Sequence, residues 1–137
     1  TMGGASGSLY GTLFISMAKA LPQDQDLTRQ ITADMFEQGV ESVKQRGKAS
    51  LGEKTMLDTL IPVANRLKDD NVNGTELPQL LNNLSEQAIT GMLSTKDMVA
   101  TKGRASFLGE RAIGHIDAGA KTSQLIICTI TDFLSHD

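Results

Sequence analysis

The sequence has few of the residues on which several functional classes depend. It contains no Trp and a single Tyr, so the aromatic side chains that stack nucleic-acid bases are missing. Its only cysteine, Cys128, can form no internal disulfide, which is typical of a reducing compartment and predicts a small core residue. The chain has thirteen basic and sixteen acidic residues, and the basic residues form no cluster. We therefore expect no nucleic-acid partner.

Long apolar runs are also absent. No stretch is apolar for long enough to span a bilayer, and the residues from Thr1 to Gly4 do not lead from basic residues into an apolar segment as a secretory signal would. These absences predict a cytoplasmic protein with no membrane partner. At 137 residues, the chain is long enough for one domain with a core of its own.

Apolar residues recur at the spacing of helices, and no segment alternates as a strand would. Asp26 or Thr28 can cap the second of these helices, and Pro62 predicts a kink in the third. A polar turn is expected at residues 69–74. The pattern predicts an all-α fold, an antiparallel bundle of amphipathic helices. The expected helices run from Leu9 to Ala20, from residue 28 to Gly47, from Thr55 to Lys68, from Leu77 to about Val99 and from Ala118 to Ser135.

Three connections rich in glycine and other small residues separate these helices, at residues 3–8, 47–55 and 103–120. In an up-and-down bundle, loops two helices apart lie at the same end. The N-termini of the first, third and fifth helices would then point the same way. Because a helix N-terminus carries a partial positive charge, three such ends together suit a polyanion.

The second connection is similar to a phosphate-binding P-loop but departs from it in two ways. Glu53 separates the second glycine from Lys54, and a helix rather than a strand precedes Gly47. We therefore do not interpret it as a P-loop. In the third connection, Asp117 stands where an N-cap belongs, and the Arg104 guanidinium together with the free N–H groups of that first turn can hold an anion. The alternative is a long connection between helices that ends in a capped helix.

In their order along the chain and in their amino-acid sequences, the three connections resemble those of the nucleotide-binding L subunit of dihydroxyacetone kinase. The resemblance covers the whole chain, and three separated motifs make it specific. It implies that residues 1–137 are a nucleotide-binding domain, about five helices of a larger helical barrel with the nucleotide at one end. The matching segments are Gly3 to Gly7 with Gly11 and Thr12, Arg46 to Lys48 with Gly52 to Met56 and Asp58, and Gly103 to Ser106 with Asp117, Gly119 and Ala120.

The segment from Leu108 to His115 is similar to the bacterial kind of this family. In that kind, a separate subunit keeps ADP bound. A phosphohistidine carrier of the sugar phosphotransferase system rephosphorylates the nucleotide, and the phosphate passes to dihydroxyacetone on a partner subunit. The resemblance thus implies a kinase subunit of glycerol metabolism with ADP or ATP as cofactor. The alternatives are the nucleotide domain of an ATP-dependent dihydroxyacetone kinase, a helical binding module without catalysis, and a binder of apolar ligands in a cavity between the helices.

The resemblance also assigns roles to single residues, none of them catalytic. From the residues alone, Arg104 and Asp117 stand out, and Met56 would be a core methionine. By position in the family motifs, Ala5 and Ser6 would contact phosphate, Gly47 and Met56 would border the adenine, Arg104 would pair with phosphate, and Asp117, Ala118 and Gly119 would close over the ribose or base.

In the family, an aspartate-rich loop that holds Mg²⁺ lies before the first glycine motif, and we expect this chain to lack it together with the N-terminal helices. No metal ligand is expected among Asp34, Asp58, Asp69 and Asp70, whose spacing differs. This segment alone should bind nucleotide weakly and should not turn over.

Loss of those helices would uncover apolar faces at Leu9, Leu13 and Met17, which predicts self-association.

Overall fold

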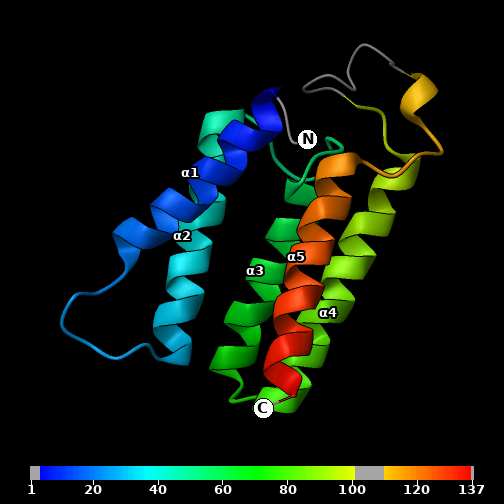
Figure 1. Ribbon diagram of the computed structural model, residues 1–137. Coiled ribbons are helices and arrows are strands. Elements are labelled where there is room, and N and C mark those ends of the chain that lie inside the picture. The colour runs from blue at the N-terminus through cyan, green and yellow to red at the C-terminus, as the bar shows by residue number, and fades with distance from the viewer. Residues whose placement is uncertain (1–3, 101–109, 137) are drawn as a thin grey trace.

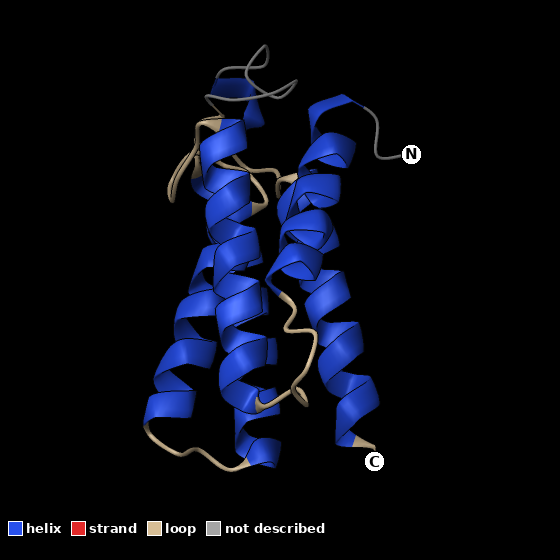
Figure 2. Cartoon of the chain, turned by 90° about the vertical axis from the view of Figure 1, so that its left-hand side faces the viewer, coloured by secondary structure: helices blue, strands red, loops and turns tan. Residues whose placement is uncertain are grey.

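The computed structural model describes residues 4–100 and 110–136, and the regular structure in these ranges is helical (Figures 1 and 2). The prediction of an all-α fold is confirmed. Among the described helices, none is long and apolar enough to cross a membrane. The elements are α1 (Gly4–Ala20), α2 (Arg29–Gly47), α3 (Leu57–Val72), α4 (Leu77–Ser94), the short 3₁₀ helix η1 (Thr95–Asp97) and α5 (Ala118–Ser135).

Successive helices pack side by side and run in alternating directions, with α1 and α2 on one side of the molecule and α3, α4 and α5 on the other (Figure 1). The last helix, α5, packs against both α4 and α3. Helix α3 is central, because Leu57, Leu60 and Val63 are almost completely buried. On α4, the expected apolar face is also buried. Its members are Leu80, Leu81, Leu84, Ala88 and Met92.

Local sequence signals explain most of the helix ends. Thr28, rather than Asp26, caps α2, since its hydroxyl oxygen accepts a hydrogen bond from the Ile31 N–H at 3.1 Å. The same helix ends at Gly47, and Lys48 follows in the left-handed conformation with φ of 50°. Helix α5 begins at Ala118, directly after the predicted cap Asp117.

Three segments differ from the sequence predictions. Helix α4, expected to reach about Val99, ends at Ser94 and is followed by η1. Residues 4–8, expected as a loop, form the first turns of α1. Ala and Ser are compatible with a helix, and each glycine in a helix lowers its stability by only about 1 kcal/mol relative to alanine. The predicted turn at residues 69–74 is mostly helix, because α3 continues to Val72. Asp70 is buried there. Its carboxylate accepts hydrogen bonds from Arg66 and Asn83, so a charged residue that suggested a turn instead joins α3 to α4.

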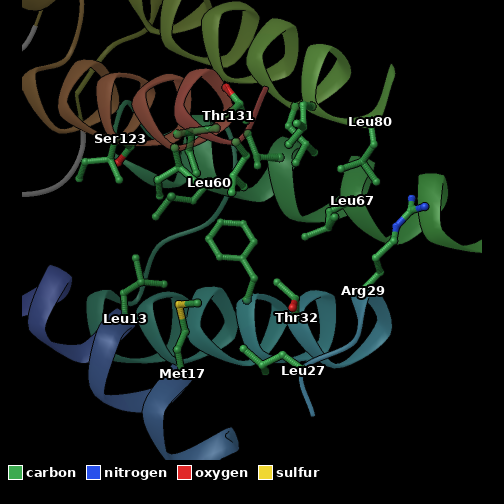
Figure 3. Close-up of a pocket in the computed structure, with 18 of the residues that line it drawn as sticks. Leu13, Met17, Leu27, Arg29, Thr32, Leu60, Leu67, Leu80, Ser123 and Thr131 are labelled. Carbon is green, nitrogen blue, oxygen red and sulfur yellow. The ribbon is translucent and has the colours of Figure 1, made fainter. Parts of the chain in front are cut away.

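An apolar cavity of about 420 Å³ lies between the α1–α2 pair and the other three helices. It extends from Tyr10 and Ser123 at one end to Leu77 and Leu134 at the other. Leu13 and Met17 face it from one side and Leu60 from the opposite side (Figure 3).

The apolar side chains that are exposed on α1 are not the ones that the sequence predicted to be uncovered. Leu13 is in the core and Leu9 is partly buried, whereas Phe14 and Ile15 are exposed. On α5, the Phe133 side chain is 69% exposed. Self-association through such side chains stays a prediction.

Candidate functional site

The N-termini of α1, α3 and α5 lie at the same end of the bundle, together with the C-terminus of α2 (Figure 1). Contacts between side chains agree with this arrangement. The Tyr10 hydroxyl of α1 donates a hydrogen bond to the Gly119 carbonyl of α5 at 2.8 Å. A Cβ added to Gly47 would lie 3.5 Å from the Leu9 side chain of α1. The up-and-down topology therefore brings the described parts of the glycine-bearing segments to one end of the bundle, as the sequence predicted.

Tyr10 joins α1 to α5 through two groups. While its hydroxyl donates to Gly119, it also lies 2.7 Å from the Ser123 hydroxyl, which can donate to it. Burial raises the pKa of Tyr10, and the nearby Asp117 charge raises it further against the effect of the Ser123 hydrogen bond. The neutral phenol therefore joins the second turn of α1 to the start of α5.

Asp117 caps α5 from a half-buried position. Its Oδ2 accepts the Ala120 N–H at 2.9 Å, and its own N–H donates to the Thr95 hydroxyl at 2.9 Å. Burial raises the pKa of the Asp117 carboxyl. The N–H groups of Ala120 and Gly119 and the positive charge of Lys54 act in the opposite direction.

The second connection closes over the start of α3 through Asp58, whose carboxylate is 2% exposed. Oδ1 accepts the Gly52 N–H at 2.7 Å, and Oδ2 accepts the Thr55 N–H at 2.9 Å. The latter bond resembles the reciprocal half of a capping box, in which an acidic side chain reaches back three residues. Because these two N–H groups are satisfied within the chain, they are not available to hold phosphate as a P-loop would.

Lys54 connects the second and third connections. It is 3% exposed and has a φ of 63°, an uncommon value for a residue other than glycine. Its ammonium group donates to the Thr95 carbonyl oxygen at 2.5 Å and to the His115 carbonyl oxygen. No role for Tyr10, Lys54 or Asp58 follows from the sequence alone. Only the Thr55-x-x-Asp58 spacing carried a signal that could have been used.

The structure brings part of the predicted set together. A Cβ added to Gly119 would lie 3.2 Å from Asp117 Oδ2 and 3.5 Å from the Met56 backbone N. Met56 is buried in the core at 3% exposure, Gly47 is half-buried as the last residue of α2, and Ala118 is exposed. Ala5 and Ser6 belong to the first turn of α1. Arg104 lies outside the described residues.

Metal ligands are not gathered in the described part of the chain. Residues 4–100 and 110–136 contain no group of three or more His, Cys, Asp or Glu side chains that could hold a metal ion. The two buried carboxylates, Asp58 and Asp70, accept hydrogen bonds from N–H groups of the chain itself. The described residues therefore do not fit a magnesium site.

Comparisons with known proteins agree on one family. Residues 1–132 match the family model described as the DAK2 domain. The ADP-binding subunit DhaL of PEP-dependent dihydroxyacetone kinase 1 from Listeria innocua is 44% identical over 125 residues, which cover 91% of this chain and 57% of the relative. The corresponding subunit from Escherichia coli is 45% identical over 120 residues, 88% of this chain and 57% of the relative.

A more distant relative is the human triokinase/FMN cyclase, which is 32% identical over 133 residues, covering 97% of this chain and 23% of the relative. The chain thus spans less than six-tenths of the length of the bacterial subunits that it matches.

Proposed function

The chain belongs to the DAK2 domain family, and from this premise we propose that it is the ADP-binding part of a dihydroxyacetone kinase subunit. The observation that carries the proposal is the meeting of three helix N-termini at one end of the bundle, where the described parts of the family motifs also lie (Figure 1). Backbone N–H groups in the first turn of an α-helix such as α1 have no carbonyl partner within the helix, and they attract phosphate oxygens. In the first turn of α5, the Ala120 N–H is already bound by Asp117.

The proposed nucleotide contacts follow the family motifs. Ala5 and Ser6, in the first turn of α1, and Arg104 would hold the phosphates. Gly47 and Met56 would border the adenine, while Asp117, Ala118 and Gly119 would contact the ribose or base. Tyr10 supports this arrangement, because its hydrogen bond to the Gly119 carbonyl sets how far the phosphate-binding turn of α1 lies from the cap of α5.

The nature of the relatives favours the phosphotransferase-dependent kind of kinase. The matching DhaL subunits are 35% to 45% identical, whereas the human triokinase/FMN cyclase is 32% identical. In that reaction scheme, a phosphohistidine carrier would phosphorylate the bound ADP, and the γ-phosphate would pass to dihydroxyacetone on a partner subunit. The nucleotide requires Mg²⁺ to offset the phosphate charge, and its ligands would lie outside the described residues. The described residues bind and orient the nucleotide.

A second candidate rests on the apolar cavity. Its volume of about 420 Å³ lies within the range of sites for small organic ligands, and most of its lining side chains are apolar. A chain that binds an apolar molecule there and no nucleotide would be a binding module rather than a kinase subunit.

Calorimetry with Mg-ADP separates these two candidates. We expect weak binding to the 137-residue chain. Arg104→Ala should weaken it at least about tenfold, because a charge-assisted hydrogen bond to phosphate is lost, with unchanged helicity by circular dichroism. The matched control is Lys68→Ala, an exposed lysine in the half of α3 away from the site that pairs with Glu37. Equal dissociation constants for the Arg104→Ala variant and the unchanged chain would remove Arg104 from the site, and no heat from the unchanged chain would contradict the nucleotide assignment.

A further inference from the structure

Lys54 occupies an unusual position for a lysine. Lysines are almost never fully buried unless they are paired, yet this side chain is 3% exposed and its backbone is in the left-handed region. Its φ of 63° costs free energy that a glycine would not lose, and such strain persists where the surroundings require the conformation. The residue therefore calls for an explanation beyond that of a surface lysine on a loop.

The ammonium group of Lys54 donates hydrogen bonds to two backbone carbonyl groups. One acceptor is the Thr95 carbonyl at the end of α4, and the other is the His115 carbonyl, two residues before the cap of α5. The Thr95 hydroxyl in turn accepts the Asp117 N–H. A single cation in the second connection thus links the end of α4 to the described part of the third connection.

Titratable groups that interact with Asp117 come from several elements. They are Lys54 in the second connection, Asp58 on α3 and the neutral phenol of Tyr10 on α1. The Lys54 charge lowers the pKa of Asp117, while burial and the Asp58 charge raise it. The buried Lys54 cation thus offsets, at Asp117, the effect of the Asp58 charge.

We propose that Lys54 is a positioning residue, which holds Asp117 and the first turn of α5 in the geometry that receives the nucleotide, without touching the nucleotide itself. Its effect on nucleotide affinity rests on the function proposed above. Its effect on Asp117 does not, so the two can be tested separately.

The test compares Lys54→Met with Asp70→Asn. Met has nearly the same length and no charge. Asp70→Asn disturbs another buried charge, which is held by Arg66, Thr75 and Asn83 far along α3 from the site, and it serves as a control for loss of stability. In Lys54→Met, we expect the pKa of Asp117, followed by NMR of its labelled carboxyl carbon, to rise, and amide exchange at residues 117–120 to accelerate at least about tenfold. Mg-ADP should bind about tenfold more weakly, because small displacements of binding groups are costly. Asp70→Asn should lower the melting temperature without these three changes.

Lys54→Arg keeps the charge and provides a second variant in case Lys54→Met does not fold. A planar guanidinium cannot reproduce the two contacts of a compact ammonium group. The pKa of Asp117 should then stay near its original value, while amide exchange at residues 117–120 accelerates. Unchanged exchange and unchanged Asp117 titration in Lys54→Met, or unchanged exchange in Lys54→Arg, would overturn the proposal. If the unchanged chain binds no Mg-ADP, the function proposed above fails, and the Asp117 measurements still decide the role of Lys54.

Discussion

Replacing Gly91 with alanine is expected to lower the free energy of unfolding by about 3 kcal/mol or more. A Cβ at this position of α4 would lie 2.2 Å from the Asp58 carbonyl oxygen and 3.0 Å from the Thr59 Cα, both backbone atoms of α3. Backbone atoms cannot turn away as a flexible side chain can, so the two helices must separate. Because α3 is the central helix, the change should disturb the packing on both of its sides.

The close approach at Gly91 is connected with Pro62. A proline at this position has no N–H to donate to the carbonyl of residue 58, four positions earlier in the helix. That carbonyl faces Gly91, so the proline within α3 and the glycine within α4 act at the same contact.

Thermal unfolding followed by circular dichroism measures the effect, and the melting temperature of Gly91→Ala should fall by about 10 °C or more. Gly11→Ala is a matched control within a helix, because a Cβ there meets nothing within 4 Å. Its stability should stay the same or rise by up to about 1 kcal/mol, since alanine is the better helix former. Equal melting temperatures for the two variants would contradict the packing described for α3 and α4.

Replacing Asp58 is the second change with a large expected effect. Asp58→Ala would remove the acceptors of the Gly52 and Thr55 N–H groups, with a loss of about 3 kcal/mol, since hydrogen bonds to charged groups contribute about 1.5 to 3 kcal/mol each. Asp58→Asn should be almost as harmful, because one of its two side-chain positions would be an NH₂ group facing an N–H donor.

Urea unfolding measures these losses, and amide exchange shows where the structure opens. Exchange at residues 50–56 should accelerate in both Asp58 variants before the rest of the chain is affected. Asp69→Asn, an exposed position on the same helix, should change the free energy of unfolding by less than about 0.5 kcal/mol. Full rescue by asparagine would contradict the acceptor role of Asp58.

The sequence predicted the helices and the common end at which α1, α3 and α5 begin, because both follow from local patterns and chain topology. Helical spacing of apolar residues located α2, α4 and α5, and N-cap chemistry identified Asp117 and Thr28. Alternation of helix direction then required α1, α3 and α5 to begin at the same end. These are consequences of spacing and topology, which a single sequence contains.

Features that depend on contacts distant in the sequence were missed. The polar composition of the segment around Asp70 suggested a turn. In the structure, Asn83 of α4 donates a hydrogen bond to Asp70, which lies within α3. Lys54 looked like a loop residue, since its two acceptors are 41 and 61 residues away. Tyr10 had the spacing of any core residue, and its partners Gly119 and Ser123 are known only from the fold.

Amide chemical-shift mapping with Mg-ADP tests the central claim most directly, namely that one end of the bundle holds a nucleoside diphosphate. The account predicts that shifts gather at residues 5–10, 47–56 and 117–120, with little change at residues 70–80 at the opposite end. Shifts confined to the lining of the apolar cavity or to residues 70–80, or no shifts at saturating nucleotide, would contradict it.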